Sequence, residues 1–225
     1  MIHKNNSWTR SRQQHPIDLY YWGNADLHSL HDPLLLIGGV HGDEPEGVYL
    51  AKHTLEWLQN LSAQEHEKIR HWILITCLNP DGYAANQRVN GGGVDLNRNF
   101  PANNWSKEFK EARYNPGPHP KSEPEIKALV DLITSVRPRT IIHCHSWKPC
   151  IVNSGPDESH YAKALSESSG FEIVKEIGYP TPGSLSSYAW FDNKIPVICI
   201  EDTEHRDSSQ VWPRFSSGLK KCFLN

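Results

Sequence analysis

A histidine and a glutamate stand three residues apart in a glycine-rich stretch, GGVHGDE at residues 38–44. At this spacing the side chains of His41 and Glu44 can turn toward one point, and an imidazole with a carboxylate is a donor pair that suits a zinc ion. The motif is short, and a glycine-rich turn that happens to hold both residues explains it equally simply. The zinc hypothesis therefore depends on a third ligand and a catalytic base elsewhere in the chain.

The third ligand is expected at the end of another strand, since two histidines, one glutamate and a water form a standard catalytic zinc set. His145 follows an apolar run at residues 140–144 and fits this role. His143 is its rival, because residues two apart on a strand point to the same face. A hydrogen-bonded core histidine is the alternative interpretation of either one. His145 is nearer to the strand end where the site should form, so we predict His145 as the third metal ligand.

Glu201 is the candidate catalytic base. It follows the apolar run VICI at residues 197–200, and a carboxylate at the end of an apolar strand is partly desolvated, which raises its pKa toward neutrality. Such a group can take a proton from a water held by the metal. Glu204 is a nearby competitor, but it lies in a polar run at residues 202–206. The alternative for Glu201 is a surface glutamate that pairs with a lysine.

Residues 79–121 form a long section rich in glycine, asparagine and proline, and a loop of this length is usually functional or disordered. It contains an NPDG turn at residues 79–82, Arg88, and the run GVDLNRNFP at residues 93–101. Arginine binds carboxylates through two parallel hydrogen bonds, so Asn97 and Arg98 can hold a substrate carboxylate. Arg88 can stabilise an oxyanion together with the metal. The alternative is that these arginines are solvated loop charges.

Apolar runs that predict strands alternate along the chain with segments of helical periodicity. Strands are predicted at residues 17–22, 34–40, 72–78, 140–144, 150–153, 171–177 and 196–200, and helices at residues 45–61, 122–136, 156–169, 184–193 and 208–223. Ser122 and Glu125 have the spacing of a capping box at the start of one helix. The alternation predicts an α/β fold with a largely parallel sheet. Ligands bind beyond the carboxyl ends of the strands in such sheets, where we expect the candidate residues to meet.

Length and composition narrow the class of protein. The 225 residues fit one domain, with a polar N-terminal arm at residues 1–16 and a catalytic domain at residues 17–225. A formal net charge of -3 argues against a nucleic-acid partner, and no window resembles a membrane span or a signal peptide. Five cysteines, an odd and scattered number, favour reduced thiols in the cytoplasm.

Taken together, these motifs resemble those of the zinc carboxypeptidase family. They occur in the same order, as HGDE at residues 41–44, NPDG at 79–82, VDLNRNF at 94–100, HS at 145–146 and the late Glu201. The resemblance covers roughly residues 34–203. Within the family, the chain is most similar to bacterial amidases that hydrolyse the γ-D-glutamyl-diaminopimelate bond of murein peptides during cell-wall recycling. The stretches NFPANNW at 99–105, SEPE at 122–125 and GYPTPGS at 178–184 support this.

The resemblance implies a mixed, largely parallel eight-stranded sheet with helices on both faces. It also implies an enzyme that binds one zinc ion per chain and releases the C-terminal residue of a small peptide. The roles that it assigns are zinc binding by His41, Glu44 and His145, base and then acid catalysis by Glu201, oxyanion stabilisation by Arg88, carboxylate binding by Asn97 and Arg98, and mobile substrate binding by Tyr179.

Two departures from the family concern specificity. The chain is shorter than the digestive carboxypeptidases, and Asp202 and Thr203 stand where the amidases more often have Leu-Pro. An N-acyl amino acid deacylase of the aspartoacylase or desuccinylase type is an alternative, because these related enzymes share HGxE and DLNR motifs. Another small-peptide carboxypeptidase is a second alternative. A catalytically silent peptide-binding module would lack a ligand or the base, and the sequence contains all of them.

Overall fold

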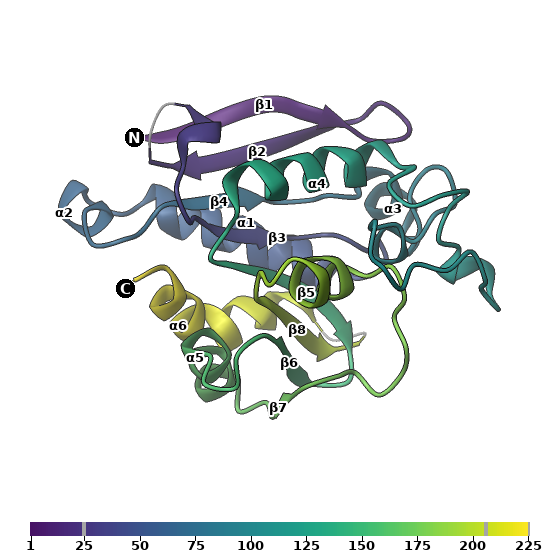
Figure 1. The fold of residues 1–225 in the computed structure, drawn as a ribbon. Helices are drawn as coiled ribbons and strands as arrows, with labels where there is room; N and C mark the ends of the chain where they lie inside the picture. The colour runs from purple at the N-terminus through teal and green to yellow at the C-terminus, as the bar shows by residue number, and fades with distance from the viewer. Residues whose placement is uncertain (24–25, 205–206, 225) are drawn as a thin grey trace.

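The computed structural model describes residues 1–23, 26–204 and 207–224. An eight-stranded sheet runs through them in the order β1-β2-β4-β3-β5-β8-β6-β7 (Figure 1). Its strands are β1 (Ile2–Arg10), β2 (Pro16–Trp22), β3 (Leu34–Ile37), β4 (Trp72–Ile75), β5 (Thr140–Trp147), β6 (Cys150–Ser154), β7 (Ile173–Val174) and β8 (Val197–Thr203). The central strands β4, β3, β5 and β8 are parallel neighbours, whereas β1–β2, β2–β4 and β6–β8 are antiparallel pairs. The predicted α/β fold with a mixed, largely parallel sheet is confirmed.

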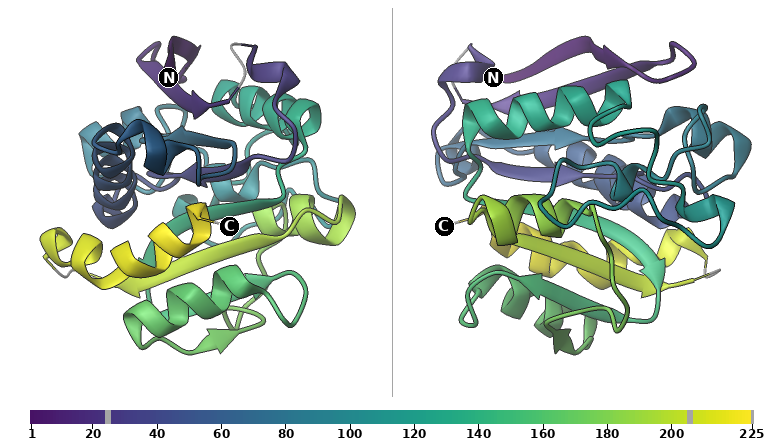
Figure 2. Two further views of the ribbon diagram at one scale, coloured as in Figure 1. Left: turned by 90° about the vertical axis from the view of Figure 1, so that its left-hand side faces the viewer. Right: turned by 45° about the vertical axis from the view of Figure 1, so that its right-hand side comes forward.

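Helices cover both faces of the sheet (Figure 2). One face carries α1 (Pro45–Gln59), α5 (His160–Ser169) and α6 (Val211–Phe223), the other carries α4 (Pro124–Val136) and the π-helical turn η4 (Ser187–Asp192), and α2 (Ala63–His66) and α3 (Pro80–Ala85) are short. Leu34 and Leu36 of β3 belong to the core with α1 and α6, while Leu35 and Ile37 belong to the core with α4. The central strands are continuous apolar runs because both of their faces are buried. No helix within the described ranges is long and apolar enough to cross a membrane.

Most of the predicted polar N-terminal arm at residues 1–16 forms the edge strand β1 (Ile2–Arg10) of the sheet instead. Strand β1 pairs antiparallel with β2 from Ile2↔Trp22 to Arg10↔Pro16. Lys4 Nζ lies 2.8 Å from Asp18 Oδ2 in β2, and charged side chains are typical of an edge strand that faces water. The apolar pattern did not indicate this strand because an edge strand buries little of its surface.

Strands β5 and β8 extend past their predicted ends at Cys144 and Ile200. Their parallel pairing continues through His145↔Glu201 to Trp147↔Thr203. The polar residues stay in strand conformation because the backbone ladder holds them, although the apolar pattern has ended. The register therefore places His145 directly beside Glu201 on one face of the sheet.

Other predicted elements differ in extent or type. The strand predicted to reach residue 78 ends at Ile75, the strand predicted at 171–177 is reduced to β7, and the helix predicted at 184–193 is the short turn η4. Asn79 begins α3 rather than an isolated turn, because its Oδ1 accepts a hydrogen bond from Gly82 N at 2.9 Å. The predicted capping box is absent: Glu123 is the N-cap of α4, and the Ser122 hydroxyl donates to Glu123 Oε1 instead.

Candidate active site and metal centre

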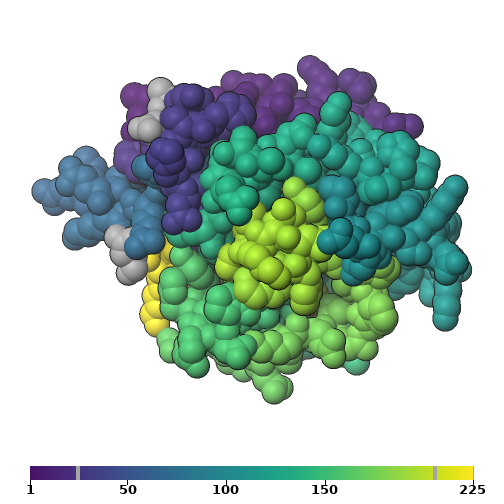
Figure 3. Space-filling model, in the orientation of Figure 1, coloured from purple at the N-terminus to yellow at the C-terminus, as the bar shows by residue number. Residues whose placement is uncertain are grey.

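A pocket of about 1080 Å³ lies at the carboxyl ends of β3, β5 and β8. On the surface in Figure 3, yellow-green residues near η4 lie against teal residues of the 79–121 loop. Asn103 N donates to Asp192 Oδ2 at 2.8 Å across this boundary. The structure brings all the predicted site residues to the pocket wall, namely His41, Glu44, Arg88, Asn97, Arg98, His145, Tyr179 and Glu201.

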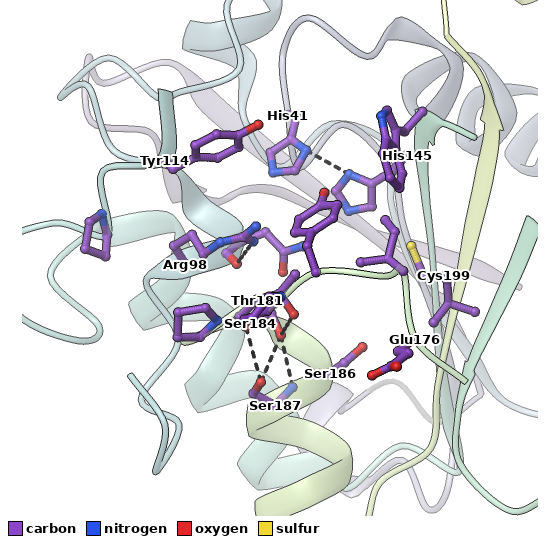
Figure 4. Close-up of a pocket in the computed structure, with 18 of the residues that line it drawn as sticks. His41, Arg98, Tyr114, His145, Glu176, Thr181, Ser184, Ser186, Ser187 and Cys199 are labelled. Carbon is purple, nitrogen blue, oxygen red and sulfur yellow. Dashed lines mark hydrogen bonds between the residues drawn. The ribbon is translucent and has the colours of Figure 1, made fainter. Parts of the chain in front are cut away.

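Three of these side chains converge on one small volume, where their ligand atoms lie within 4.8 Å of one another. His41 follows β3, Glu44 is the N-cap of α1, and His145 lies on β5. His145 Nδ1 is 2.8 Å from His41 Nδ1 (Figure 4). Glu44 Oε2 lies 2.6 Å from His145 Nδ1, and Glu44 Oε1 lies 2.9 Å from His41 Nδ1. Two nitrogens and a carboxylate thus face one point.

The outer nitrogens of both imidazoles have other partners. His41 Nε2 lies 3.0 Å from Asp95 Oδ1, and His145 Nε2 lies 2.9 Å from His143 Nδ1. If the outer nitrogens carry the ring protons, both Nδ1 lone pairs point toward Glu44. Although burial raises the pKa of the Glu44 carboxyl, His41 and His145 hold it well below its usual range. Two buried lone pairs and an ionised carboxylate are a donor set that fits a zinc ion.

A close approach between two loops brings the ligands to this point. A Cβ atom on Gly42 would lie 1.9 Å from the carbonyl carbon of Gly82, the residue in the first turn of α3. Only glycine fits here. The backbones of the HGDE turn and the NPDG turn are therefore in direct contact. This contact packs the HGDE turn against the start of the 79–121 loop.

Arg88 and Asp95 form a buried ion pair beside the ligands. Arg88 Nε donates to Asp95 Oδ2 at 2.9 Å, and Arg88 Nη1 donates to Glu44 Oε1 at 3.1 Å. Burial raises the pKa of the Asp95 carboxyl, but the stronger effect of His41 and Arg88 leaves it lowered. Asp95 thus connects His41 to the guanidinium, and this arrangement orients a metal-binding imidazole.

Glu201 lies beside His145 in the sheet and is only 4% exposed. Burial, followed by the charge of Glu44, raises the pKa of its carboxyl to about 8. The Cys199 thiol donates to Glu201 Oε1 at 3.3 Å. The competitor Glu204 is exposed and follows the end of β8. The desolvated carboxylate expected at the strand end is therefore at Glu201.

The predicted substrate-binding side chains occupy a second wall of the pocket. Arg98 Nη1 donates to the Asn97 carbonyl at 2.8 Å, and Asn97 Oδ1 accepts from Leu185 N at 2.9 Å. The amide nitrogen of Asn97 has no hydrogen-bond partner among the described residues, and Asn97 lines the pocket. Tyr179 is 39% exposed and contacts Trp147 edge to face, with ring centroids 5.2 Å apart.

The sequence motifs predict no role in the site for Asp95, Tyr114 or Cys199. Tyr114 lies under the guanidinium groups of Arg88 and Arg98, whose central carbons are 5.2 and 5.9 Å from its ring centroid. An acid within the VDLNRNF motif was a visible signal for Asp95. Nothing in the local sequence indicates the other two contacts, which arise from the folding of the loop and from strand register.

The profile of the zinc carboxypeptidase family matches residues 7–207. This match covers most of the chain, so the chain belongs to the zinc carboxypeptidase family.

The most informative relatives are murein amidases. Murein peptide amidase A of Escherichia coli (strain K12) is 34% identical over 165 residues, which cover 68% of this chain and 64% of the relative. The matched stretch is thus less than two thirds of that relative's length. The corresponding protein of Vibrio campbellii is 29% identical over 178 residues, which cover 74% of this chain and 68% of the relative.

Solved structures extend the likeness to nearly the whole fold. The crystal structure of the murein-tripeptide amidase from Escherichia coli O157 has a TM-score of 0.79 at 27% identity and covers 98% of this chain and 91% of that one. The structure of thrombin activatable fibrinolysis inhibitor has a TM-score of 0.77 at 19% identity and covers 99% of this chain and 70% of that one. The second likeness concerns the fold alone.

Proposed function

We propose that this protein is a zinc-dependent hydrolase that cleaves the γ-D-glutamyl-diaminopimelate amide bond of murein peptides and releases the C-terminal residue. The observation that carries the proposal is the convergence of His41, Glu44 and His145 beside the buried carboxylate of Glu201. Family membership supports the hydrolase class and the zinc ion. The similarity to murein amidases supports the substrate.

A zinc ion held by His41, Glu44 and His145 would supply a Lewis acid and lower the pKa of a water molecule. Glu201 in its ionised form accepts the proton of the attacking water, and its raised pKa makes this carboxylate a stronger base than an exposed one. It then gives this proton to the leaving amine. Arg88 places positive charge beside the ligands, where negative charge develops on the carbonyl oxygen.

The opposite walls of the pocket suit the two ends of the leaving residue. Asn97 and Arg98 offer donors for its free α-carboxylate. Figure 4 shows Glu176 and Ser186 across the pocket from Arg98. The Glu176 carboxylate has no ion-pair partner among the described residues, so it is available for a cationic group. A C-terminal residue with a carboxylate at one end and an ammonium group at the other, as in diaminopimelate, fits this arrangement.

The thiols and the substrate suggest the cellular compartment. The five cysteines are all unpaired, which is typical of proteins in a reducing environment. We therefore propose action in the cytoplasm on murein peptides that are recovered from the wall.

The test is mass spectrometry of L-Ala-γ-D-Glu-diaminopimelate incubated with protein of measured zinc content, with and without a chelator. Free diaminopimelate should appear with zinc-loaded protein only. An acyl-aspartate in a parallel reaction tests the deacylase alternative, and its hydrolysis in place of the tripeptide would contradict the proposal. With Glu176→Gln, hydrolysis of the diaminopimelate peptide should fall several-fold more than that of an analogue without the distal amine.

A further inference from the structure

A second histidine lies directly behind the ligand His145 on the same face of β5. His143 Nδ1 is 2.9 Å from His145 Nε2, and the two rings meet edge to face with centroids 4.7 Å apart. His143 is 2% exposed. It is not a member of the group His41, Glu44 and His145 that converges on the metal position.

The position of the ring proton on His145 follows from the site geometry. Its Nδ1 faces Glu44 Oε2 and His41 Nδ1, so this nitrogen carries the lone pair when His145 binds a metal. A neutral imidazole holds its proton on the other nitrogen. That proton lies on Nε2 and points at Nδ1 of His143. His143 is therefore the acceptor, and its own proton is on Nε2.

This tautomer leaves His143 Nε2 without a hydrogen-bond partner in the described part of the chain. A buried donor without a partner is destabilising. The residues that pair with His143 in the sheet are Ile37 of β3 and Cys199 of β8, and Ile37 belongs to the apolar core together with Ile141, two residues earlier on β5. An aliphatic residue at position 143 would suit that environment better than an imidazole does. Packing alone thus gives no reason for a histidine here.

We propose that His143 is a positioning residue for the metal centre. By accepting the hydrogen bond from His145 Nε2, it fixes the tautomer and the ring orientation that aim Nδ1 at the metal. Groups that hold a metal-binding histidine in this way commonly change metal affinity when they are removed. The inference rests on the proposed zinc site.

The two imidazole ligands then have different supports. His41 has the carboxylate of Asp95, which is paired with Arg88, whereas His145 has a neutral imidazole. A carboxylate at position 143 would place another negative charge near Glu44 and Glu201, and the repulsion between these charges would be unfavourable in a buried site. A neutral acceptor orients His145 without adding that charge.

The test compares three variants. His143→Leu removes the acceptor and keeps an apolar side chain of useful size, His143→Asn restores an acceptor oxygen near the Nδ1 position, and Cys199→Ala changes the neighbour that faces His143 across the β5–β8 pair. For each we would measure the zinc dissociation constant by competition with a chromophoric chelator. The urea midpoint of the metal-free protein would be measured in parallel.

We expect His143→Leu to bind zinc about 10- to 100-fold more weakly, while the metal-free protein is as stable as the wild type or more stable. His143→Asn should recover most of the affinity. Cys199→Ala should leave zinc affinity unchanged, and a large loss would show that zinc is held by the alternative set of His143, His145 and Cys199, which would overturn the inference.

Two further outcomes separate this inference from the proposed function. Wild-type affinity in His143→Leu, or a loss that only accompanies a less stable metal-free protein, would overturn the positioning role alone. Wild-type protein that binds no zinc would overturn the proposed function and this inference with it.

Discussion

Two regions of the molecule place the site residues by different means. The β5–β8 pair places His145 and Glu201 by backbone register, so their relative position follows from the sheet. The 79–121 loop places Arg88, Asp95 and Arg98 without a sheet, and asparagine side chains hold its backbone. Asn99 Nδ2, for example, donates to the Pro116 carbonyl at 2.8 Å. The strands thus supply a rigid half of the site, and the loop supplies a half that depends on individual side chains.

The largest effect is expected on the strand side, from Glu201→Gln. Loss of the base should lower kcat by about 100- to 10,000-fold, while zinc content stays near that of the wild type because Glu201 is not a ligand. Steady-state kinetics with metal analysis would measure both. Glu204→Gln is the matched control and should keep full activity. A near-normal kcat in Glu201→Gln would show that the base is elsewhere.

The next effect concerns the contact between the loop and the ligands. Asp95→Asn removes the charge that orients His41 and pairs with Arg88. Zinc affinity should fall by about 10- to 100-fold, as measured by chelator competition. If affinity were unchanged, the loop would contribute substrate-binding groups only, and the metal site would belong to the strand ends and the HGDE turn.

A smaller effect is expected within the loop itself, from Asn99→Ala. The side-chain amide nitrogen of Asn99 also donates to the His119 carbonyl at 3.1 Å and to the Ser122 hydroxyl at 2.9 Å. Losing these buried partners should destabilise the protein by about 1–3 kcal/mol, as measured by urea unfolding. Asn103→Ala, at an exposed position, should have less effect. Equal effects of the two changes would contradict the idea that buried asparagines order the loop.

The last effect is a pH dependence of stability just beyond the loop, in the first turn of α4. Burial, with the nearby charge of Glu123 as a further cause, raises the pKa of Glu125 to about 7. A carboxyl whose folded pKa exceeds its unfolded value of 4.5 adds stability below the unfolded pKa and loses it as pH rises through the folded pKa. The free energy of unfolding should therefore fall by roughly 1–3 kcal/mol between pH 5 and pH 8 relative to Glu125→Gln. Parallel pH profiles in the two proteins would refute this.

The same contrast explains what could be predicted from the sequence. His145 and Glu201 each follow an apolar run, and apolar runs indicate buried strands. Their position near the carboxyl ends of two strands was therefore predictable. The contact of Asp95 with His41 was not, because it depends on the path of a long loop that no periodicity describes. Strand β1 was also missed, since a polar edge strand carries little apolar pattern.

The claim that most needs a direct test is that His41, Glu44 and His145 hold one zinc ion. X-ray absorption at the zinc edge of the loaded protein would measure the ligands themselves. The account predicts nitrogen and oxygen neighbours at about 2.0–2.2 Å and no sulfur. A zinc–sulfur distance of about 2.3 Å would place the ion on Cys199 instead and contradict the account.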